Sequence, residues 1–347
     1  MKRSQIPGTL CHAVIAIALL LTFCASSYAQ SPPPAACADT TPHTERLVTV
    51  APGVQLQVLD WGGAGKPDTM VLLTGLGDNA HIYDDFAFQF TDYFHVIGIT
   101  RRGYLPSSQP GNGYEVATRA LDDISVLDAL GISKAVFVGH SLAASELNAI
   151  ATAHKDRVEK LVYLDAYDLA ERFQLPEVPV APFVTADLNS LETFQAARAR
   201  LLAVRGANPS ICLQLEFNSS GKIAGFTTPD SIPVKLLAGI KAPANPPVNW
   251  KDVAAPRLGI FALYSAETRQ SYYWYLSAAE KKQFDQNFKG IIDWQRETID
   301  EFRSGNPKNP EPIVVDLPPG NTHYIFLNNE AFVVRRMRQF LLGESGN

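Results

Sequence analysis

Hydrophobic and polar positions follow two alternating patterns along most of this chain. Some segments are short, continuous apolar runs with the length and β-branched character of strands buried on both faces. These runs cover residues 69–74, 93–100, 134–138, 160–166 and 257–264. Stretches with helical spacing lie between several of them, such as 80–91 and 114–130. Buried strands that alternate with helices predict a doubly wound, mostly parallel α/β sheet with helices on both faces.

The two ends of this pattern add further elements. Residues 47–51 and 54–62 alternate apolar and polar positions, as an antiparallel hairpin at a sheet edge does. Near the other end, a capping box at 277–280 predicts the start of a long helix. A last strand at 312–317 then precedes a final helix at 329–342.

The alternation stops between about Leu169 and Ala254. Prolines are scattered through this stretch, and helical pieces such as 190–204 are short. An insertion that covers the sheet would have this pattern, so an inserted helical lid is predicted at 169–254. The core of the domain is then expected at 46–168 and 255–347.

Residues 1–29 have the pattern of a secretory signal peptide. Two basic residues precede an apolar run at 13–23, and small residues lead to a cleavage site after Ala29. The run is too short to cross a bilayer, which takes about 20 residues. Residues 30–45 are rich in proline and small polar residues and predict a flexible arm. A secreted or periplasmic protein is therefore expected.

Composition and net charge limit the kinds of molecule that this protein is expected to bind. The 347 residues are 46% hydrophobic and 19% charged, which is typical of a globular protein. Loss of the signal peptide removes two basic side chains, so the net charge goes from −5 to −7 (−5 − 2). This balance does not favour nucleic acid or an anionic membrane, and a small-molecule substrate is expected. Cys37 and Cys212 remain and could form one disulfide in an oxidising compartment.

The pentapeptide Gly-His-Ser-Leu-Ala at 139–143 lies between a buried strand and a helix. It is similar to the G-x-S-x-G turn, whose small residues allow a sharp bend that exposes the serine, here Ser141. Ala143 differs from the last glycine by one methyl group. The amide of Leu142 lies at a helix N-terminus, where an oxyanion is stabilised. A serine that only caps a helix has the same local pattern, so other parts of the chain have to distinguish the two.

A histidine in the loop before the final helix, His323, adds the second part of a catalytic pattern. With Ser141 and His323 in these places, the chain resembles the α/β-hydrolase fold family over about 46–168 and 255–345. The resemblance implies that His323 takes the proton of Ser141 and that a carboxylate orients the imidazole. Structural hydrogen bonds are expected instead for His43, His95, His140 and His154.

The resemblance leaves two positions for the acid. Haloalkane-dehalogenase-like relatives use the end of the strand after the elbow helix, which corresponds to Asp165. Most members use the loop after the strand at 257–264, where Glu267 is available. Asp165 is preferred, with Glu267 as the alternate, although a strand-end carboxylate can also simply cap backbone amides. Epoxide hydrolases and haloalkane dehalogenases need an aspartate nucleophile, so Ser141 implies acyl transfer.

The second oxyanion donor is expected in the glycine-rich segment 74–77. This segment resembles the His-Gly motifs of the family with Thr74 in place of the histidine, and the amide of Leu76 is the candidate donor, together with that of Leu142. A secreted serine hydrolase is predicted, which cleaves carboxylic ester or lactone bonds through an acyl-enzyme without a metal or cofactor.

Two other functions fit parts of the sequence. Residues 75–80 match G-x-G-x-x-A, and Arg101 and Arg102 at the end of the next strand could receive the 2′-phosphate of NADP. Two strands precede this motif, whereas a dinucleotide-binding motif opens the first βα unit. The second alternative is a hydrolase-like binding protein whose triad is idle.

Overall fold

The structure is a computed structural model that describes most of the expected core. The described residues are 41–76, 78–104, 106–167, 215–217, 223–226, 239, 250–263, 278–304, 313–316 and 324–344. The expected signal peptide, both remaining cysteines, Glu267 and His323 lie outside them, as does most of the segment expected to form a lid.

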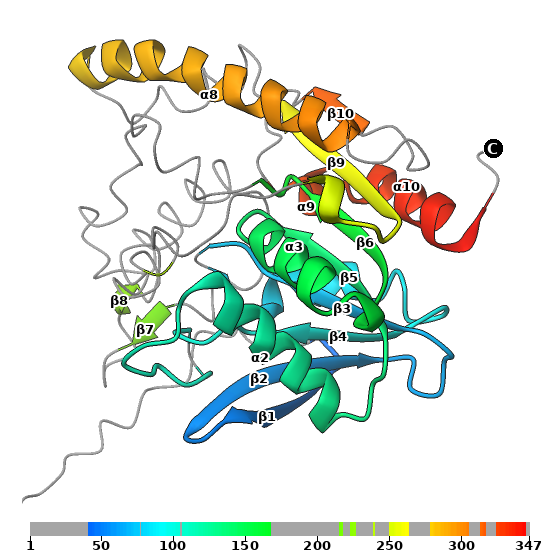
Figure 1. The fold of residues 1–347 in the computed structure, drawn as a ribbon. Coiled ribbons are helices and arrows are strands. Elements are labelled where there is room, and N and C mark those ends of the chain that lie inside the picture. Colours follow the sequence, from blue (N-terminus) through cyan, green and yellow to red (C-terminus); the bar gives the residue numbers. More distant parts are fainter. Residues whose placement is uncertain are drawn as a thin grey trace, which may run out of the picture.

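A single eight-stranded sheet forms the centre of the molecule (Figure 1). Its strands lie in the order β1-β2-β4-β3-β5-β6-β9-β10. They are β1 Thr44–Ala51, β2 Val54–Gly62, β3 Thr69–Leu73, β4 His95–Ile99, β5 Ala135–His140, β6 Val158–Leu164, β9 Arg257–Leu263 and β10 Ile313–Asp316. The pairs β1–β2 and β2–β4 are antiparallel, and the other neighbours are parallel. The edge hairpin and the mostly parallel sheet are therefore as predicted.

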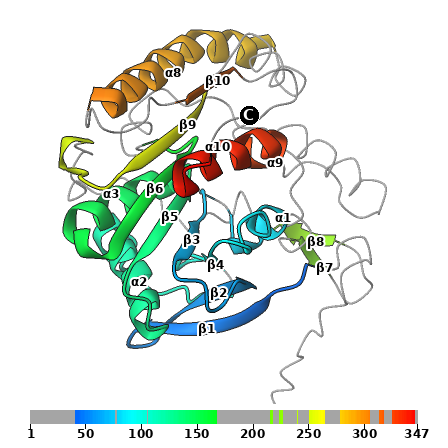
Figure 2. The ribbon, with the colours of Figure 1, turned by 90° about the vertical axis from the view of Figure 1, so that its right-hand side faces the viewer.

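Helices cover both faces of this sheet (Figure 2). One face packs against α2 Val116–Ala129, α3 Ala143–Ala153 and α8 Ala278–Ser304. The opposite face packs against the helical turn η2 Ala80–Tyr83, α1 Asp84–Ala87, α9 Ile325–Asn328 and α10 Glu330–Leu342. Neighbouring residues of one strand take opposite sides, since Val71 belongs to the first core and Leu72 to the second. This arrangement follows from strands that are apolar at every position.

The structure differs from the predicted elements at three places. The helix predicted over 80–91 is shorter, because a 3-10 turn that Asn79 caps leads into the single turn α1, and turns follow to residue 93. The predicted arm at 30–45 ends earlier, because β1 begins at Thr44 and pairs with β2 from that residue on. The described parts of the predicted helical lid include a two-stranded sheet of β7 Leu215–Phe217 and β8 Ile223–Phe226. Within the described residues, no helix has the length and apolar character needed to cross a membrane.

Candidate active site

Ser141 occupies a backbone conformation that few residues adopt. It lies between β5 and α3 with φ = 53° and is 6% exposed. A left-handed conformation costs a residue with a Cβ free energy of about 1–3 kcal/mol and persists only where the surroundings enforce it. Among the described residues other than glycine, only Ser141 and Asp165 have positive φ. The strand-to-helix turn is therefore as sharp as the sequence pattern predicts.

Small side chains allow this turn to close. A Cβ added at Gly139 would lie 2.9 Å from the Cβ of Ala143 and 2.8 Å from a methyl carbon of Leu147. Real Cβ contacts are longer, so α3 would have to move away from β5 if residue 139 had a side chain. The methyl group of Ala143 fits because Gly139, its neighbour across the turn, has none. This explains why alanine can replace the last glycine of the motif.

Leu142 connects Ser141 to α3. It is fully buried, has helical dihedral angles and precedes the first residue of the helix. Its backbone N–H is thus one of the first groups of α3, which have no carbonyl partner within the helix. The partial positive charge of a helix N-terminus lies at this point, beside the Ser141 hydroxyl. The position suits a donor to an oxyanion.

Asp165 ends the strand next to that of Ser141. His140 and Leu164 are partners in the β5–β6 register, so Ser141 and Asp165 each lie one residue beyond the same rung of the sheet. Asp165 is fully buried with φ = 45°, its backbone N–H donates to the carbonyl of Ile260 at 2.7 Å, and its Oδ1 accepts from the amide of Ala262 at 2.8 Å. The hydrogen bonds to β9 fix this carboxylate at the carboxyl edge of the sheet.

Tyr324 and His140 bring the neighbours of two predicted catalytic residues together. Tyr324 follows His323 in the chain, and His140 precedes Ser141. Their rings pack with centroids 4.8 Å apart, and both side chains are buried. The Tyr324 hydroxyl also donates to the carboxylate of Asp78, with oxygen separations of 3.0 and 3.1 Å. The chain beside His323 is therefore attached to the loop after β3 and to the serine turn.

The loop after β3 has little space around Gly75. A Cβ on Gly75 would lie 2.7 Å from Nδ1 of His140 and 3.0 Å from Oδ2 of Asp78. Thr74 donates its hydroxyl to the carbonyl of Asp78 at 3.2 Å, which closes the loop on itself. Leu76, the candidate donor, is half-buried. Glycine is thus required at residue 75 because His140 and Asp78 approach the backbone from two sides.

Arg101 fixes the orientation of this loop. Its guanidinium donates to the carbonyl of Thr74 at 2.8 Å and to the carbonyl of Gly75 at 3.1 Å. The peptide between Gly75 and Leu76 is planar and trans, so its N–H points away from its carbonyl. Because Arg101 holds the carbonyl of Gly75, the N–H of Leu76 is directed to the other side of the loop.

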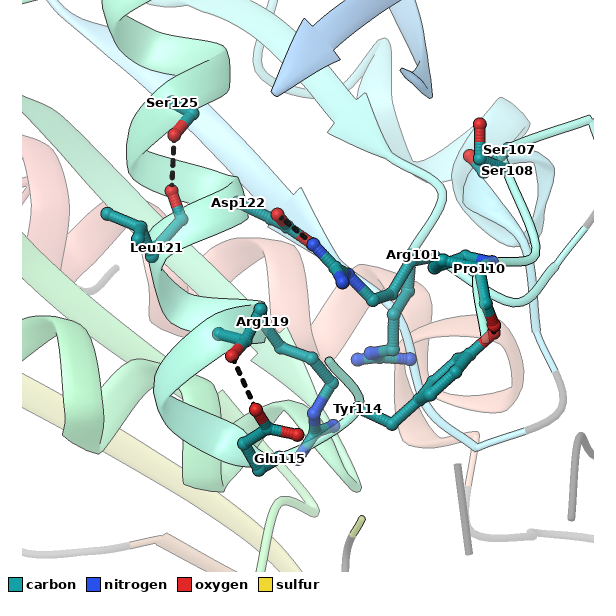
Figure 3. A network of polar contacts seen from close by, with 12 residues as sticks. Arg101, Ser107, Ser108, Pro110, Tyr114, Glu115, Arg119, Leu121, Asp122 and Ser125 are labelled. Atoms are coloured by element: carbon teal, nitrogen blue, oxygen red, sulfur yellow. Dashed lines mark hydrogen bonds and ion pairs between the residues drawn. The ribbon is translucent and has the colours of Figure 1, made fainter. Parts of the chain in front are cut away.

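A buried ion-pair network holds Arg101 in turn. Both carboxylate oxygens of Glu146 on α3 accept from Arg101 at 2.6 Å, and Oε1 also accepts from Arg119 on α2 at 3.1 Å. Figure 3 shows the side chains of Arg101 and Arg119 from this network. Burial alone would lower the pKa of Arg101, but the charge of Glu146 more than offsets this and raises the pKa. Burial likewise opposes ionisation of Glu146, yet Arg101 and Arg119 hold its pKa below the usual value. The charged forms of Arg101 and Glu146 therefore stabilise each other, whereas burial lowers the pKa of Arg119.

Arg101 and Arg102, the two arginines of the NADP interpretation, are both held in buried ion pairs. Arg102 makes a two-pronged contact with Asp122 on α2, through Nε and through Nη2 at 2.6 Å. Arg101 and Arg102 are each at least 94% buried (6% and 4% exposed). Neither guanidinium is available to a 2′-phosphate. The segment 75–80 also leads into a 3-10 turn instead of opening a long helix, so the NADP interpretation is wrong.

The structure describes some of the predicted site residues and leaves others outside the described part of the chain. It places Ser141, Leu142 and Asp165 at one edge of the sheet, with Leu76 in the neighbouring loop. His323 and Glu267 lie outside the described residues. Sequence reasoning missed Asp78, Glu146 and Tyr324. Two of these had a usable signal, since Asp78 directly follows the glycine-rich loop and Tyr324 directly follows His323.

Known proteins with similar sequences and folds agree with this architecture. Residues 68–202 match the family model described as alpha/beta hydrolase fold. A non-heme chloroperoxidase from Streptomyces lividans is 32% identical over 161 residues, which is 46% of this chain and 55% of that protein. A putative carbamate hydrolase, RutD, from Caulobacter segnis is 32% identical over 33% of this chain and 43% of that protein. The chain thus spans about half the length of the curated relatives it matches.

A solved structure extends the likeness to the whole core. The crystal structure of E-2-(acetamidomethylene)succinate hydrolase superposes with a TM-score of 0.56 at 19% identity, and the match covers 86% of this chain and 99% of that one. The strand order, the serine turn and these matches lead to one conclusion. The chain has the α/β-hydrolase fold, and residues 68–202 match the model of that family.

Proposed function

We propose that this protein is a serine hydrolase that cleaves carboxylic ester bonds through an acyl-enzyme intermediate. The observation that carries the proposal is the strained turn that presents Ser141 at the N-terminus of α3, one strand away from the buried carboxylate of Asp165. Strain of this kind is concentrated at functional sites. A serine that only capped α3 would not need positive φ, because N-cap residues have extended backbone angles.

The reaction assigns one role to each residue. The hydroxyl of Ser141 attacks the substrate carbonyl while His323 takes its proton, and the amides of Leu76 and Leu142 donate to the oxyanion. His323 then protonates the leaving alcohol as the carbon–oxygen bond breaks. A water molecule, deprotonated by the same imidazole, attacks the acyl group and releases the acid and Ser141. Asp165 keeps the imidazole in the tautomer that accepts the serine proton.

Contacts of Tyr324, the residue after His323, support the proposed role of His323 as the base that takes the serine proton. The ring of Tyr324 packs on His140, and its hydroxyl is held by Asp78. The residues next to His323 and next to Ser141 are therefore in contact, although they are far apart in the chain. This contact between neighbours in sequence supports the pairing of His323 with Ser141 in the proposed mechanism.

Esters are the proposed substrate class because an alkoxide is a much better leaving group than an amide anion, so C–O cleavage depends less on protonation by His323 than C–N cleavage does. Lactones contain the same bond and are included. One relative is named a putative carbamate hydrolase, and one similar structure is an E-2-(acetamidomethylene)succinate hydrolase, so carbamates and amides belong in the substrate panel. We further propose that the enzyme acts outside the cytoplasm after cleavage behind Ala29, on the pattern of residues 1–29 alone.

The first prediction concerns the nucleophile. Ser141→Ala is expected to abolish labelling by a fluorophosphonate and to lower kcat for a short-chain p-nitrophenyl ester at least about 10³-fold, because no other hydroxyl can form the acyl-enzyme. Ser145→Ala is the matched control, since Ser145 is equally buried one turn later. Both serines lie in the tryptic peptide 135–155, so fragment masses locate the label. Stoichiometric labelling of Ser141→Ala would mean that another residue is the nucleophile, and no labelling of the wild type would leave a binding protein. Either result contradicts the proposal.

A second prediction concerns Arg101. Arg101→Lys keeps the charge but loses the fork that holds Glu146 and the carbonyls of Thr74 and Gly75 together, so kcat is expected to fall about 10- to 100-fold with KM nearly unchanged. Full loss of an oxyanion donor costs about 10²- to 10³-fold. Arg102→Lys weakens an equally buried pair, because the guanidinium of Arg102 donates to Asp122 and to the carbonyl of Asn112 and not to the carbonyls of Thr74 and Gly75. Its kcat should stay within about threefold. Equal losses in both variants at equal melting temperatures would mean that Arg101 does not orient the donor.

The third prediction tests the acid. Asp165→Asn is nearly isosteric and still accepts from the amide of Ala262, so the fold should be retained. The neutral amide cannot stabilise an imidazolium, and kcat is expected to fall about 10³- to 10⁴-fold. Glu267→Gln should change kcat less than threefold. If Glu267→Gln alone abolishes turnover, Asp165 is a structural residue.

The fourth prediction concerns Tyr324 as a positioning residue. Tyr324→Phe keeps the packing on His140 but loses the bonds to Asp78, so kcat is expected to fall about 10-fold at similar KM. Tyr163→Phe removes another buried tyrosine hydroxyl, which donates to Asn148 at 2.7 Å away from this loop. The two variants should lose similar thermal stability, and only Tyr324→Phe should lose kcat. Retention of kcat in Tyr324→Phe argues against the positioning role.

A further inference from the structure

Two histidines and an aspartate meet at the antiparallel edge of the sheet, apart from the candidate active site. His43 precedes β1, His81 lies in η2, and Asp84 begins α1. One ligand atom of each lies within 4.8 Å of the other two. Within the described residues, no other group of three or more histidines, cysteines, aspartates or glutamates has this geometry.

The separation of the two most buried groups suits a shared ion. Nδ1 of His81 lies 3.1 Å from Oδ2 of Asp84. Ligand atoms about 2.0–2.2 Å from a tetrahedral zinc ion are about 3.3 Å from one another. A metal ion could therefore take the place of the shared proton with a shift of a few tenths of an ångström. His81 and Asp84 are 7% and 2% exposed, so water does not fully solvate either group.

The carboxylate of Asp84 is already oriented toward the histidines. Its Oδ1 accepts from the indole N–H of Trp61 at 3.0 Å, which leaves Oδ2 directed at His81. Such outer hydrogen bonds fix the orientation of ligands in metal sites. The backbone of His81 is fixed as well, because its N–H donates to the side chain of Asn79 at 3.1 Å.

His43 completes the group from the solvent side. Its ring meets that of His81 edge to face, with centroids 5.1 Å apart and planes at 72°. His43 is half-buried and immediately precedes the strand at the sheet edge. Its ligand atom lies within 4.8 Å of those of His81 and Asp84, so it has to move closer to them to bind the same ion. The partial exposure gives an ion a path to the site.

The geometry points to a binding site for a borderline divalent cation of the zinc type, with His43, His81 and Asp84 as ligands and water in the fourth position. Two imidazoles and one carboxylate suit zinc, and the absence of thiolates and of a carboxylate cage disfavours copper(I) and calcium. The ion would join the start of β1 to η2, which begins four residues after Leu76. The site is independent of the proposed ester hydrolysis.

Zinc titration of the untagged, chelator-treated full chain tests this inference. Isothermal titration with ZnCl₂ should give one site per chain in the micromolar range or tighter, and zinc at 100 times the Kd should raise the melting temperature by about 5 °C. MgCl₂ should do neither. His43→Gln should weaken zinc binding at least 10-fold, and its far-UV circular dichroism should stay unchanged because His43 lies at the edge of the fold.

A matched control separates this site from a simple histidine–aspartate pair. His95 bonds Asp60 at 2.9 Å in the same way as His81 bonds Asp84, but no third ligand joins them in the described part of the chain. His95→Gln should bind zinc as the wild type does. Cobalt(II) should give the strong visible absorption of a four-coordinate ion in the wild type and in His95→Gln, and should lose it in His43→Gln. Absence of one-to-one zinc binding by the wild type, or equal binding by His43→Gln, overturns the inference.

Discussion

The buried contact between Arg101 and Glu146 holds together the three parts of the molecule that build the candidate site. Arg101 follows β4, Glu146 belongs to the helix after the serine turn, and the carbonyls that Arg101 also binds belong to the loop after β3. Burying two charges is costly unless their geometry is favourable and the remaining protons are bonded. Here the guanidinium makes two short bonds to the carboxylate and bonds two carbonyls. Loss of Glu146 would leave the charge of Arg101 without this carboxylate in the core, and loss of Arg101 would remove the bonds that hold the loop.

Two strained residues lie on adjacent strands, and the sheet explains why both can persist. Ser141 and Asp165 have positive φ at the ends of β5 and β6. Each costs about 1–3 kcal/mol, which the surrounding contacts have to offset. The amide of Ser141 faces the carbonyl of Leu164 at 3.4 Å, and Asp165 is bonded to β9 through its amide and its carboxylate. The parallel sheet thus supports the bend at each strand end through its next neighbour.

The sequence was sufficient for the elements that local patterns determine. Apolar runs identified the buried strands, and small residues on both sides of Ser141 identified the turn. The helix predicted over 80–91 was wrong because its apolar residues serve a different purpose: Tyr83, Phe86 and Phe90 are all fully buried, and successive turns bury them as well as a helix would.

Long-range polar pairs could not be predicted in this way. Glu146 looks like an ordinary polar residue of a helix, and only the fold shows that two arginines approach it from 45 and 27 residues away. The same arginine, Arg101, had suggested a phosphate site when read without its partner. A buried arginine indicates an anionic partner, but the hydrophobic periodicity of the sequence does not reveal that the partner of Arg101 is Glu146.

Hydrogen bonds hold the loop between β3 and η2 at both ends, and this limits how far its backbone can move during a reaction. Arg101 binds its first carbonyls, and at the far end the amide of Ala80 donates to the hydroxyl of Thr100 at 2.9 Å, which in turn donates to Gln57 at 2.6 Å. An oxyanion donor contributes most when it needs no reorganisation during the reaction. A loop held on both sides of Leu76 satisfies this condition before substrate arrives. In the proposed mechanism this loop donates to the carbonyl oxygen that all acyl substrates share. Under that proposal, the residues that distinguish one acyl group from another lie outside the loop.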